Sequence, residues 1–425
     1  MTQVDESRPL TREENDLLTQ TGPGTPGGEL LRRYWQPVAL SEELPPSGAP
    51  RPVRIMSEDL VLFRDDGDRL GLLGLHCAHR GADLSYGRLE DGGLRCIYHG
   101  WLYDVSGRCL EQPGEPAGST FHERLRHRAY PCREVGGIIF AYMGPGEPPL
   151  FPAYEPLLAD EGYRVSKKRL SDCNYLQSHE GNLDPEHLSF LHHGLPRREG
   201  NFYSAPPIVR TEETPFGGRV YSIRPAPDGM RFVKTTCFVM PNINATGPDH
   251  GGFQMGWHVP IDDFSHWRYS VGFRRTAPMD ELARTESVSE IADGYRHVRN
   301  RANRYLQDRE AMKTWSYSGI GTSNGPQDAC VQEGMGAIED RTEEHLGTTD
   351  QGVLLARDRL LRAIQDVLAG RDPPHVVRDE TSNHHDIRVV TAVIPGDRDW
   401  YNFWESSQEA GVVSPFRALR AAGRV

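Results

Sequence analysis

Two short segments of the chain each carry one cysteine and one histidine at metal-ligand spacing. The first contains Cys77 and His79 as C-x-H, and the second contains Cys96 and His99 as C-x₂-H. Thiolate and imidazole donors in paired short loops are typical of a metal site. A structural zinc site is one interpretation, although its common spacings place a cysteine pair before a histidine pair. One cysteine and one histidine in each loop instead favour a [2Fe–2S] cluster with two thiolates on one iron and two imidazoles on the other.

Imidazole ligands change what such a cluster can do. Exchanging thiolates for imidazoles raises the reduction potential, to roughly −150 to +300 mV. The histidines can also be protonated and form hydrogen bonds, which cysteine thiolates ligating the metal do not offer as donors.

A second group of polar residues lies in the segment 174–193. Asp184, His187 and His192 form the pattern D-x₂-H-x₄-H. Residues three apart share a helix face, whereas residues five apart point about 140° apart on an ideal helix. His187 and His192 can therefore bind one ion only where the helix bulges or stops between them, an irregularity that favours functional sites. His193 is the alternative to His192.

Both segments resemble those of the Rieske non-haem iron oxygenases. The stretch from Cys77 to Trp101 is similar to the Rieske motif of that family, except that Ala78 stands where family members usually have proline. The segment 174–193 resembles the mononuclear-iron motif, and its upstream N-x₂-Q and Glu180 match as well. The two motifs also follow each other in the order that the family shows.

Iron that activates O₂ typically needs two histidines and one carboxylate, which leave other positions open. The segment 325–336 resembles the family segment that supplies the carboxylate, and the resemblance implies that Asp328 is the third ligand. Glu333 and Asp340 are the alternatives. The stretch 340–347 is similar to the phthalate dioxygenase-like branch of the family.

The resemblance also implies a role for Asp184. In the family, this acid links the mononuclear site to the Rieske cluster of a neighbouring subunit. Carried over, Asp184 contacts His187 in its own chain and His99 of the neighbouring subunit. Such a link must be hydrogen-bonded and would also orient a ligand imidazole. The alternative is an acid that only caps the helix beginning at Pro185.

The elements that must position these residues follow from hydrophobic patterning and turn signals. Strands are predicted near 53–56, 60–63, 70–75 and 138–142, and a linker rich in proline and glycine over 144–156. Further strands are predicted near 219–224, 231–240, 253–260 and 266–275. Helices are predicted from Thr11 and over 29–35, 174–193, 279–315 and 350–369.

The predicted fold class is α+β. It has an N-terminal helical segment over 1–36, a Rieske [2Fe–2S] β domain over 37–145, and a catalytic domain over 146–425. The resemblance implies that an antiparallel sheet and helices surround the mononuclear iron in the catalytic domain.

Composition excludes several classes of function. The chain has 425 residues and a formal net charge of −12, which argues against a nucleic-acid-binding surface as its main function. No run of 18 uncharged apolar residues and no signal peptide is found, so no membrane segment is predicted. Seven cysteines in a chain of this length do not look like a disulfide framework, which favours a reducing, cytoplasmic setting.

Two other patterns carry less. Residues 22–27 fit G-x-G-x-x-G but follow a helix signal rather than a strand and contain two prolines, so they predict no nucleotide site. His384 and His385 have no third ligand nearby in the sequence. With no NAD or flavin motif present, the electrons are expected from a separate NAD(P)H-dependent reductase of the flavin and ferredoxin type.

The resemblance implies the oxygenase component of a multicomponent Rieske system, with a [2Fe–2S] cluster, a mononuclear Fe(II) and O₂ as co-substrate. The implied substrate is an aromatic carboxylate such as a phthalate or a diaryl acid. O-demethylation of a methoxylated lignin-derived aromatic acid is the alternative reaction. Family members are commonly homotrimers or stacked trimers, which agrees with electron transfer across subunits.

Two hypotheses from other classes remain on the sequence alone. An iron–sulfur electron carrier would contain no mononuclear iron, and a zinc-stabilised binding protein would be colourless. Colour and an iron count separate all three.

Overall fold

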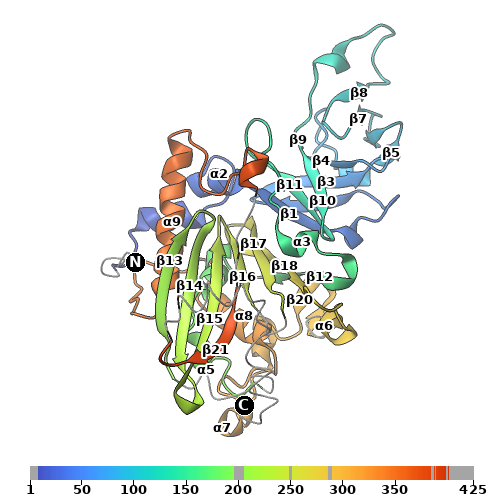
Figure 1. The fold of residues 1–425 in the computed structure, drawn as a ribbon. Coiled ribbons are helices and arrows are strands. Elements are labelled where there is room, and N and C mark those ends of the chain that lie inside the picture. The colour runs from blue at the N-terminus through green and yellow to red at the C-terminus, as the bar shows by residue number, and fades with distance from the viewer. Residues whose placement is uncertain are drawn as a thin grey trace.

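A computed structural model describes residues 8–195, 205–247, 251–285, 290–383, 387, 389–398 and 401. A small β lobe, residues 51–130, projects from a larger α+β body (Figure 1). His384 and His385 lie outside the described residues.

The small β lobe consists of two four-stranded antiparallel sheets, ordered β2-β3-β4-β9 and β5-β6-β7-β8. The first comprises β2 (Arg51–Ile55), β3 (Glu58–Arg64), β4 (Leu70–Gly74) and β9 (Ala129–Tyr130). The second comprises β5 (Arg88–Glu90), β6 (Gly93–Arg95), β7 (Leu102–Tyr103) and β8 (Cys109–Glu111).

Strand β3 faces two hydrophobic cores because its side chains alternate between the two faces of the sheet. Val61 and Phe63 belong to the core of the small β lobe, which also contains Cys77 and Cys96. Leu60 and Leu62 belong to the main core of the body. The lobe is therefore packed onto the body through a strand that is apolar on both sides.

A three-stranded sheet, ordered β1-β11-β10, lies at the junction of lobe and body. It contains β1 (Trp35–Leu40), β10 (Cys132–Val135) and β11 (Ile138–Tyr142), and β11 is buried along its whole length. Strand β1 also contacts two strands of the large sheet, β12 and β17. The predicted linker over 144–156 follows directly, and α3 (Glu155–Leu158) forms at its end.

The body is built on an eight-stranded antiparallel sheet ordered β12-β18-β17-β16-β15-β14-β13, with β21 paired to β15. Its strands are β12 (Arg164–Ser171), β13 (Ile208–Thr214), β14 (Gly217–Pro225), β15 (Met230–Val239), β16 (Ile243–Thr246), β17 (Gln254–Asp262), β18 (Ser265–Phe273) and β21 (Thr391–Pro395).

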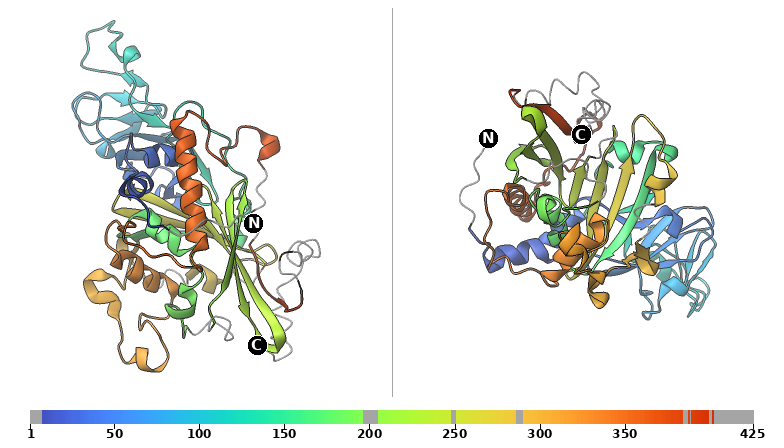
Figure 2. Two further views of the ribbon diagram at one scale, coloured as in Figure 1. Left: turned by 90° about the vertical axis from the view of Figure 1, so that its left-hand side faces the viewer. Right: turned by 90° about the horizontal axis from the view of Figure 1, so that it is seen from below.

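Helices cover one part of this sheet and meet the N-terminal segment there. The amphipathic helix α9 (Gln351–Leu368) contacts β13 and β14 and also α1 (Arg12–Thr19) and α2 (Pro26–Arg32). Figure 2 shows α9 running upright beside these two N-terminal helices. Val353, Leu360, Ile364 and Val367 on its predicted apolar side are buried, whereas Leu368 at its end is exposed.

Two further helices complete the layer near the sheet. Helix α4 (Tyr175–Gly181) contacts β17, β18 and α8 (Asn324–Gly334). The short helix α5 (His187–Phe190) follows α4. Both predicted motifs are thus placed by distinct parts of the fold, one by the lobe and one by these helices.

A buried carboxylate ties α4 to α9. The Glu180 carboxylate forms ion pairs with Arg341 (Oε2 to Nη2, 2.8 Å) and with Arg357 (Oε1 to Nε, 2.6 Å). The two arginine side chains are 0% and 4% exposed. Burial alone would raise the pKa of Glu180, but the two guanidinium groups lower it to about 2. This ion pair cluster holds the helix that precedes the second motif against the long helix of the body.

The helix predicted over 279–315 is wrong. The described part of that range contains α6 (Glu281–Thr285), a two-stranded sheet of β19 (Ile291–Ala292) and β20 (Arg296–His297), and α7 (Ala311–Thr314). Gly294 adopts φ +71°, and Asn300 caps a 3₁₀ turn with its side chain. The charged residues of this range follow a helical period, but no continuous apolar stripe is available for burial. Residues that favour turns therefore determine the backbone conformation.

The single helix predicted over 174–193 is also wrong in detail, since α4 and α5 are separate. Pro185 lacks an N–H group and disfavours helical geometry in the residue before it, which accounts for the interruption. The helix predicted over 29–35 begins earlier, at Pro26, with the Thr25 side chain as its cap.

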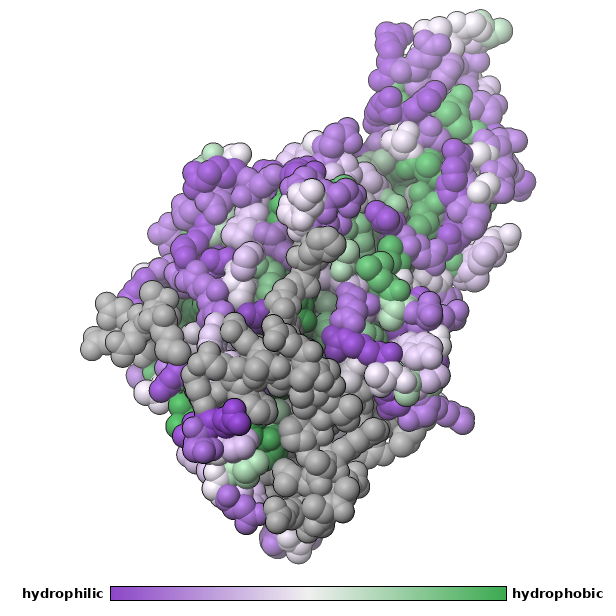
Figure 3. Space-filling view, in the orientation of Figure 1, coloured by the Kyte–Doolittle hydropathy of each residue, from purple (hydrophilic) through white to green (hydrophobic). Residues whose placement is uncertain are grey.

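The face drawn in Figure 3 is mostly hydrophilic, with hydrophobic patches on the projecting lobe and where it joins the body. Among the described residues, none of the helices has the length and apolar character needed to cross a membrane.

Replacing Glu180 by Gln should destabilise the protein by about 3–5 kcal/mol, because two buried arginines would lose their counter-charge. The stabilisation is fully present above the ordinary glutamate pKa of about 4.3 and is lost as pH falls through about 2. Chemical denaturation followed by circular dichroism measures it. Asp366→Asn, which breaks an exposed pair with Arg371, is the control and should cost under about 1 kcal/mol. Equal effects of the two variants would contradict the anchoring role.

Candidate metal centres

The two Cys/His loops of the small β lobe share one backbone design. The carbonyl of Cys77 accepts from the Gly81 N–H at 2.8 Å, and that of Cys96 accepts from the Gly100 N–H at 3.0 Å. Both glycines have positive φ, +73° and +75°, a conformation that costs other residues about 1 kcal/mol or more. Each turn therefore begins with a cysteine and ends with a glycine. The histidine lies two residues before the glycine in the first turn (His79) and directly before it in the second (His99).

The four side chains of these two loops lie close together. Cys77 and Cys96 are each 3% exposed. The rings of His79 and His99 lie 4.4 Å apart at their centroids, and Trp101 stacks on His79 at 4.5 Å. Burial raises the pKa of the Cys77 thiol, and the neighbouring Cys96 raises it further. Two buried sulfur atoms beside two exposed imidazoles match the donor set of a [2Fe–2S] cluster.

This donor set fits a two-iron cluster better than one zinc ion. A tetrahedral ion with bonds of about 2.0–2.3 Å would bring all its donor atoms within about 4 Å of one another. Among the described residues, three donor atoms within 4.8 Å of each other occur at His187, His192 and Asp328 and in one group of glutamates, but not in the loops of the lobe. A donor set that is spread over two centres is what a [2Fe–2S] cluster requires.

The surface at the imidazoles is exposed and partly apolar. His79 and His99 are both exposed. The Tyr98 ring, 3.8 Å from that of His99 at the centroids, is 55% exposed, and the adjacent Ile97 is 61% exposed. Large apolar side chains beside an exposed redox site are suited to contact with another protein.

The second motif is positioned by the end of a helix. His187 is the first residue of α5, which ends at Phe190, so the helix stops before His192. The expected interruption between the two histidines is therefore present. The chain then turns through Gly194 at φ +88°, where a Cβ atom would lie 1.6 Å from the Trp315 carbonyl oxygen. This close approach requires glycine.

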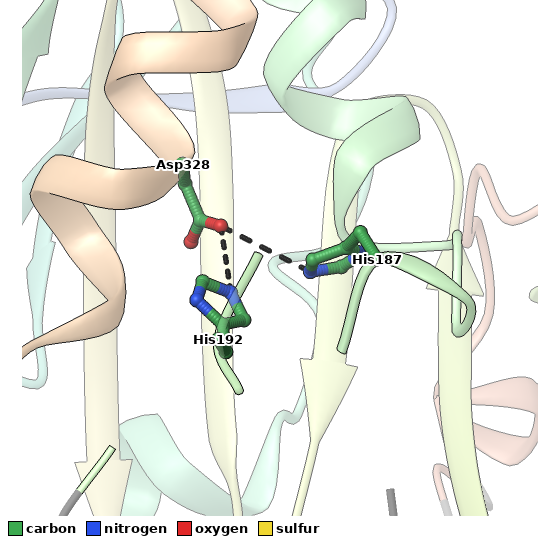
Figure 4. A group of neighbouring side chains, drawn as sticks. All are labelled: His187, His192 and Asp328. Atoms are coloured by element: carbon green, nitrogen blue, oxygen red, sulfur yellow. Dashed lines mark ion pairs between the residues drawn. The ribbon is translucent and has the colours of Figure 1, made fainter. Parts of the chain in front are cut away.

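His187, His192 and Asp328 meet at one point (Figure 4). The Asp328 Oδ1 atom lies 2.9 Å from His192 Nε2 and 3.9 Å from His187 Nε2. Burial alone would raise the pKa of Asp328. The charges of His192 and His187 outweigh burial and hold this pKa well below its ordinary range. Two imidazoles and one carboxylate aimed at a common point have the ligand types and number of a 2-His-1-carboxylate iron site.

The alternative residues lie elsewhere. Glu333 accepts hydrogen bonds from the Tyr305 hydroxyl and the Asp172 N–H. Asp340 pairs with Arg12 at 2.5 Å. His193 is exposed, whereas His192 is 1% exposed. The geometry thus separates the predicted residues from each of their alternatives.

Gln327 contacts His192 at the ring nitrogen that faces away from Asp328, and no sequence pattern predicts this contact. Its Oε1 atom lies 2.7 Å from His192 Nδ1, and its amide nitrogen donates to the Ile320 carbonyl at 2.9 Å. An acceptor at Nδ1 leaves the Nε2 lone pair for the shared point. Gln327 therefore fixes both the orientation and the tautomer of His192.

Asp184 lies beside His187, as the predicted link requires within one chain. Its Oδ1 atom accepts from the Glu186 N–H at 2.7 Å in the turn before α5, and its Oδ2 atom lies 3.4 Å from His187 Nδ1. Burial raises the pKa of Asp184, but the His187 contact and backbone N–H groups lower it more. The side chain is 27% exposed and lies between the site and a second hollow lined by Phe190, Met312, Tyr317 and Met335.

A cavity of about 670 Å³ adjoins the second site. It is formed against the inner face of the large sheet and reaches His187, His192 and Asp328. This volume is within the usual range for small-molecule sites. Its walls include Arg169, Arg268 and His297, which sequence reasoning did not select. Strand register, which pairs Arg169 with Arg268, is the signal that a sequence alone lacks.

Two family models match the chain. Residues 34–129 match the Rieske [2Fe–2S] domain, and residues 203–418 match a model described as LigXa C-terminal domain like. The second match covers about half of the chain, and the first covers both Cys/His loops.

Several curated proteins are similar over most of their length. The phthalate 4,5-dioxygenase oxygenase subunit of Pseudomonas putida is 36% identical, with 93% of this chain and 94% of that protein covered. The 5,5'-dehydrodivanillate O-demethylase oxygenase subunit of Sphingobium sp. (strain NBRC 103272 / SYK-6) is 35% identical over 88% and 85%. The phenoxybenzoate dioxygenase subunit alpha of Ectopseudomonas oleovorans is 37% identical over 84% and 87%.

Solved structures share the fold at lower identity. The terminal oxygenase of carbazole 1,9a-dioxygenase from Novosphingobium sp. KA1 has a TM-score of 0.58 and 22% identity, with 81% of this chain and 94% of that chain covered. Dicamba monooxygenase bound to dicamba has a TM-score of 0.58 and 18% identity, covering 80% and 99%.

Replacing Gln327 by Leu should weaken metal binding at His192 by about 10- to 100-fold, because the imidazole would lose the contact that orients it. Equilibrium dialysis of Fe(II) against a metal buffer measures this. Gln307→Leu, which removes only a hydrogen bond to the Ser318 carbonyl, is the control. Unchanged iron affinity in Gln327→Leu would show that His192 is oriented without it.

Proposed function

The chain belongs to the Rieske non-haem iron oxygenases, and on that premise we propose that it hydroxylates an aromatic carboxylate with O₂ and electrons from a separate reductase. The family uses a [2Fe–2S] cluster and a non-haem iron, and the chain is the oxygenase component of such a system. The observation that carries the proposal is the presence of both donor sets in one chain, with a cavity beside the second.

The proposed ligands are those expected from the sequence. Cys77, His79, Cys96 and His99 would hold the cluster, and His187, His192 and Asp328 would hold the mononuclear iron. The iron, when bound, supplies the O₂-activating chemistry of a 2-His-1-carboxylate centre. The protein residues keep the carboxylate ionised, orient His192 through Gln327, and place the cavity next to the open side of the site.

An aromatic acid is the proposed substrate because of the relatives and the cavity. The names of three relatives refer to phthalate, dehydrodivanillate and phenoxybenzoate. The cavity has Arg169, Arg268 and Arg274 in its wall, and guanidinium groups suit a carboxylate. The substrate lies beside the iron, so its orientation decides which carbon reacts.

O-demethylation is the second candidate reaction. It is favoured by the 35% identity to the dehydrodivanillate O-demethylase subunit, which is close to the 36% and 37% identity to the phthalate and phenoxybenzoate dioxygenase subunits. The same cavity would serve it, with a methoxy carbon rather than a ring carbon next to the iron.

Electrons are proposed to pass between subunits. The two metal-binding regions lie at opposite ends of one chain, since the strands β5–β8 project away from α5 (Figure 1). Asp184 lies beside His187 and borders the second hollow, whose lining includes the exposed side chains of Phe190 and Met335. The exposed Cys/His loops of another subunit's small β lobe could dock there. We propose a homotrimer or stacked trimers in which Asp184 contacts His99 of the neighbouring subunit.

The proposed domain boundaries remain those expected from the sequence, after residues 36 and 145. The N-terminal helices α1 and α2 contact α9 of the catalytic part, and Arg32 of α2 also pairs with Glu58 of the small β lobe at 3.0 Å. An NAD(P)H-dependent reductase of the flavin and ferredoxin type is the proposed electron donor.

A substrate screen with a surrogate reductase tests the proposed function. Phthalate, 3-phenoxybenzoate and a methoxylated benzoate should be compared, and the product mass should show one or two added oxygen atoms or the loss of a methyl group. Absence of any oxidised product from aromatic acids, in a protein with full cluster and iron content, would contradict the proposal.

Each of the variants His187→Ala, His192→Ala and Asp328→Ala should abolish turnover and the mononuclear iron while the cluster spectrum stays intact, because the two sites use different residues. Iron analysis and visible absorption measure the two centres separately. Asp340→Asn changes a carboxylate that pairs with Arg12 and serves as the control. If Asp328→Ala keeps its iron and full activity, the carboxylate is misassigned and Glu333 is the next candidate.

Asp184→Asn distinguishes an electron link from a helix cap. Asn caps about as well as Asp, so a pure cap predicts a mild effect. As a link, the variant loses the charge that faces His187 and should slow reoxidation of the reduced cluster by about 10- to 100-fold, with both metal sites still occupied. A single-turnover experiment with substrate and O₂ measures this rate. Unchanged reoxidation would leave capping as the better account.

A further inference from the structure

The cavity beside the iron site contains two arginines that face each other across a strand pair. Arg169 on β12 and Arg268 on β18 are direct partners in the antiparallel register. Directly opposed residues point to the same face with Cβ atoms about 4.5–5.5 Å apart. Both side chains line the cavity. Two like charges in this arrangement destabilise a sheet unless something of opposite charge lies between them.

The protein supplies little negative charge to these arginines. Among the described residues, Arg169 has no ion pair or hydrogen bond, and its buried Nε atom is without a partner. Arg268 donates to the neutral Asn182 side chain at 2.8 Å. Burial lowers the pKa of both guanidinium groups, that of Arg268 to about 9 with Arg169 adding to the effect. Asp328, which is proposed as a metal ligand, opposes this shift for both arginines, and Glu333 also opposes it for Arg169.

A buried histidine completes the same corner of the cavity. His297 on β20 is 6% exposed, and neither of its ring nitrogens has a hydrogen-bond partner. Burial lowers its pKa to about 3, and Arg169 and Arg268 add to the effect, so the ring is neutral and has one N–H to donate. An unpaired polar group in this position costs about 1–3 kcal/mol, which a ligand would recover.

The N-terminus of α8 points to the same place. Ser323, Asn324 and Gly325 line the cavity, and the Ser323 side chain does not cap the helix. Free N–H groups at the start of a helix favour an anion. A Cβ atom on Gly325 would lie 2.7 Å from Arg169 Nη1 and 3.1 Å from the His297 ring, so guanidinium, imidazole and helix start are immediate neighbours. Asp328 follows Gly325 by one helical turn.

We propose that Arg169, Arg268, His297 and the start of α8 form a subsite that binds the carboxylate of the aromatic substrate. The inference rests on the proposed function and assigns the residues that determine its substrate class. The planar guanidinium groups bind the two carboxylate oxygens, and the neutral imidazole donates a third hydrogen bond. Anchoring the acid at this end of α8 fixes which part of the ring reaches the iron one turn further along.

Binding measurements with a matched pair of probes test the subsite. The probes are 3-phenoxybenzoate and 3-phenoxybenzamide, which have nearly the same shape and differ in charge. Anaerobic calorimetry on the metal-loaded protein should give about 10- to 100-fold weaker binding of the acid to Arg169→Met and Arg268→Met. Binding of the amide should change by less than about threefold. The affinity of Arg169→Lys for the acid should lie between the affinities of wild type and Arg169→Met, because lysine keeps the positive charge but lacks the two parallel N–H donors of a guanidinium group.

A control and a stability readout separate binding from structure. Arg296→Gln removes one positive charge next to His297 in the sequence, but its side chain is exposed and paired with Asp172, so binding of the acid should stay unchanged. Ligand-free Arg169→Met should unfold at the same or a higher temperature than wild type, since it loses an unpaired charge. A fall of several degrees with loss of the cluster would mean that Arg169 is structural, and would overturn the proposal.

The remaining outcomes distinguish this inference from the proposed function. Equal affinity of wild type for acid and amide, or unchanged acid binding in both Met variants, overturns the subsite even if oxidised product forms. Arginine-dependent binding of the acid supports the subsite even if turnover assays give no product, in which case the proposed oxygenation fails alone.

Discussion

The contact between His192 and Asp328 is the constraint on which the catalytic part of the molecule depends. It joins the turn after α5 to the middle of α8, two segments far apart in the sequence, at 2.9 Å. Holding a carboxylate in a largely buried position needs neighbouring positive or donor groups. Arg169 and Arg268 of the cavity supply positive charge, and an iron ion held together with His187 and His192 would supply more. The break between α4 and α5, the glycine turn at 194 and the Gln327 contact all serve to hold this one point.

The local parts of this arrangement could be predicted from the sequence. The Cys/His loops are short, so the spacing of Cys77, His79, Cys96 and His99 already determines which side chains are near each other. The need for a helix to stop between His187 and His192 followed from the helical period alone. Asp328 required a resemblance, because no local pattern joins it to the histidines. Its placement beside them depends on how α8 packs against α4.

Other features were beyond sequence reasoning for physical reasons. The range 279–315 has charged residues in a helical period, but local turns at Gly294 and Asn300 outweighed that weak preference. Arg169 and Arg268 become neighbours only through the register of β12 with β18. Gln327 and His297 are ordinary polar residues in the sequence, and their roles arise from burial beside an imidazole and a guanidinium group. Tertiary contacts between distant segments, rather than residue type, carry this information.

The two lobes divide the chemistry between them. The small β lobe keeps the sulfur atoms of Cys77 and Cys96 buried and the imidazoles of His79 and His99 exposed, which suits a site for electron exchange. The body keeps His192 buried and Asp328 partly buried beside a cavity, which suits a site for substrate oxidation. These ends are well separated in one chain (Figure 1), so the proposed electron path requires a second chain. Electrons stored in the cluster must then be used at the mononuclear site.

A single-turnover experiment with isotopically labelled oxygen tests that central claim most directly. The protein would be reduced chemically, freed of reductant, and mixed with ¹⁸O₂ and 3-phenoxybenzoate. The account predicts that cluster absorption returns to the oxidised form while ¹⁸O appears in the product, in an amount no greater than that of the mononuclear iron. Reoxidation of the cluster without any ¹⁸O in an organic product, in protein with full iron content, would contradict it.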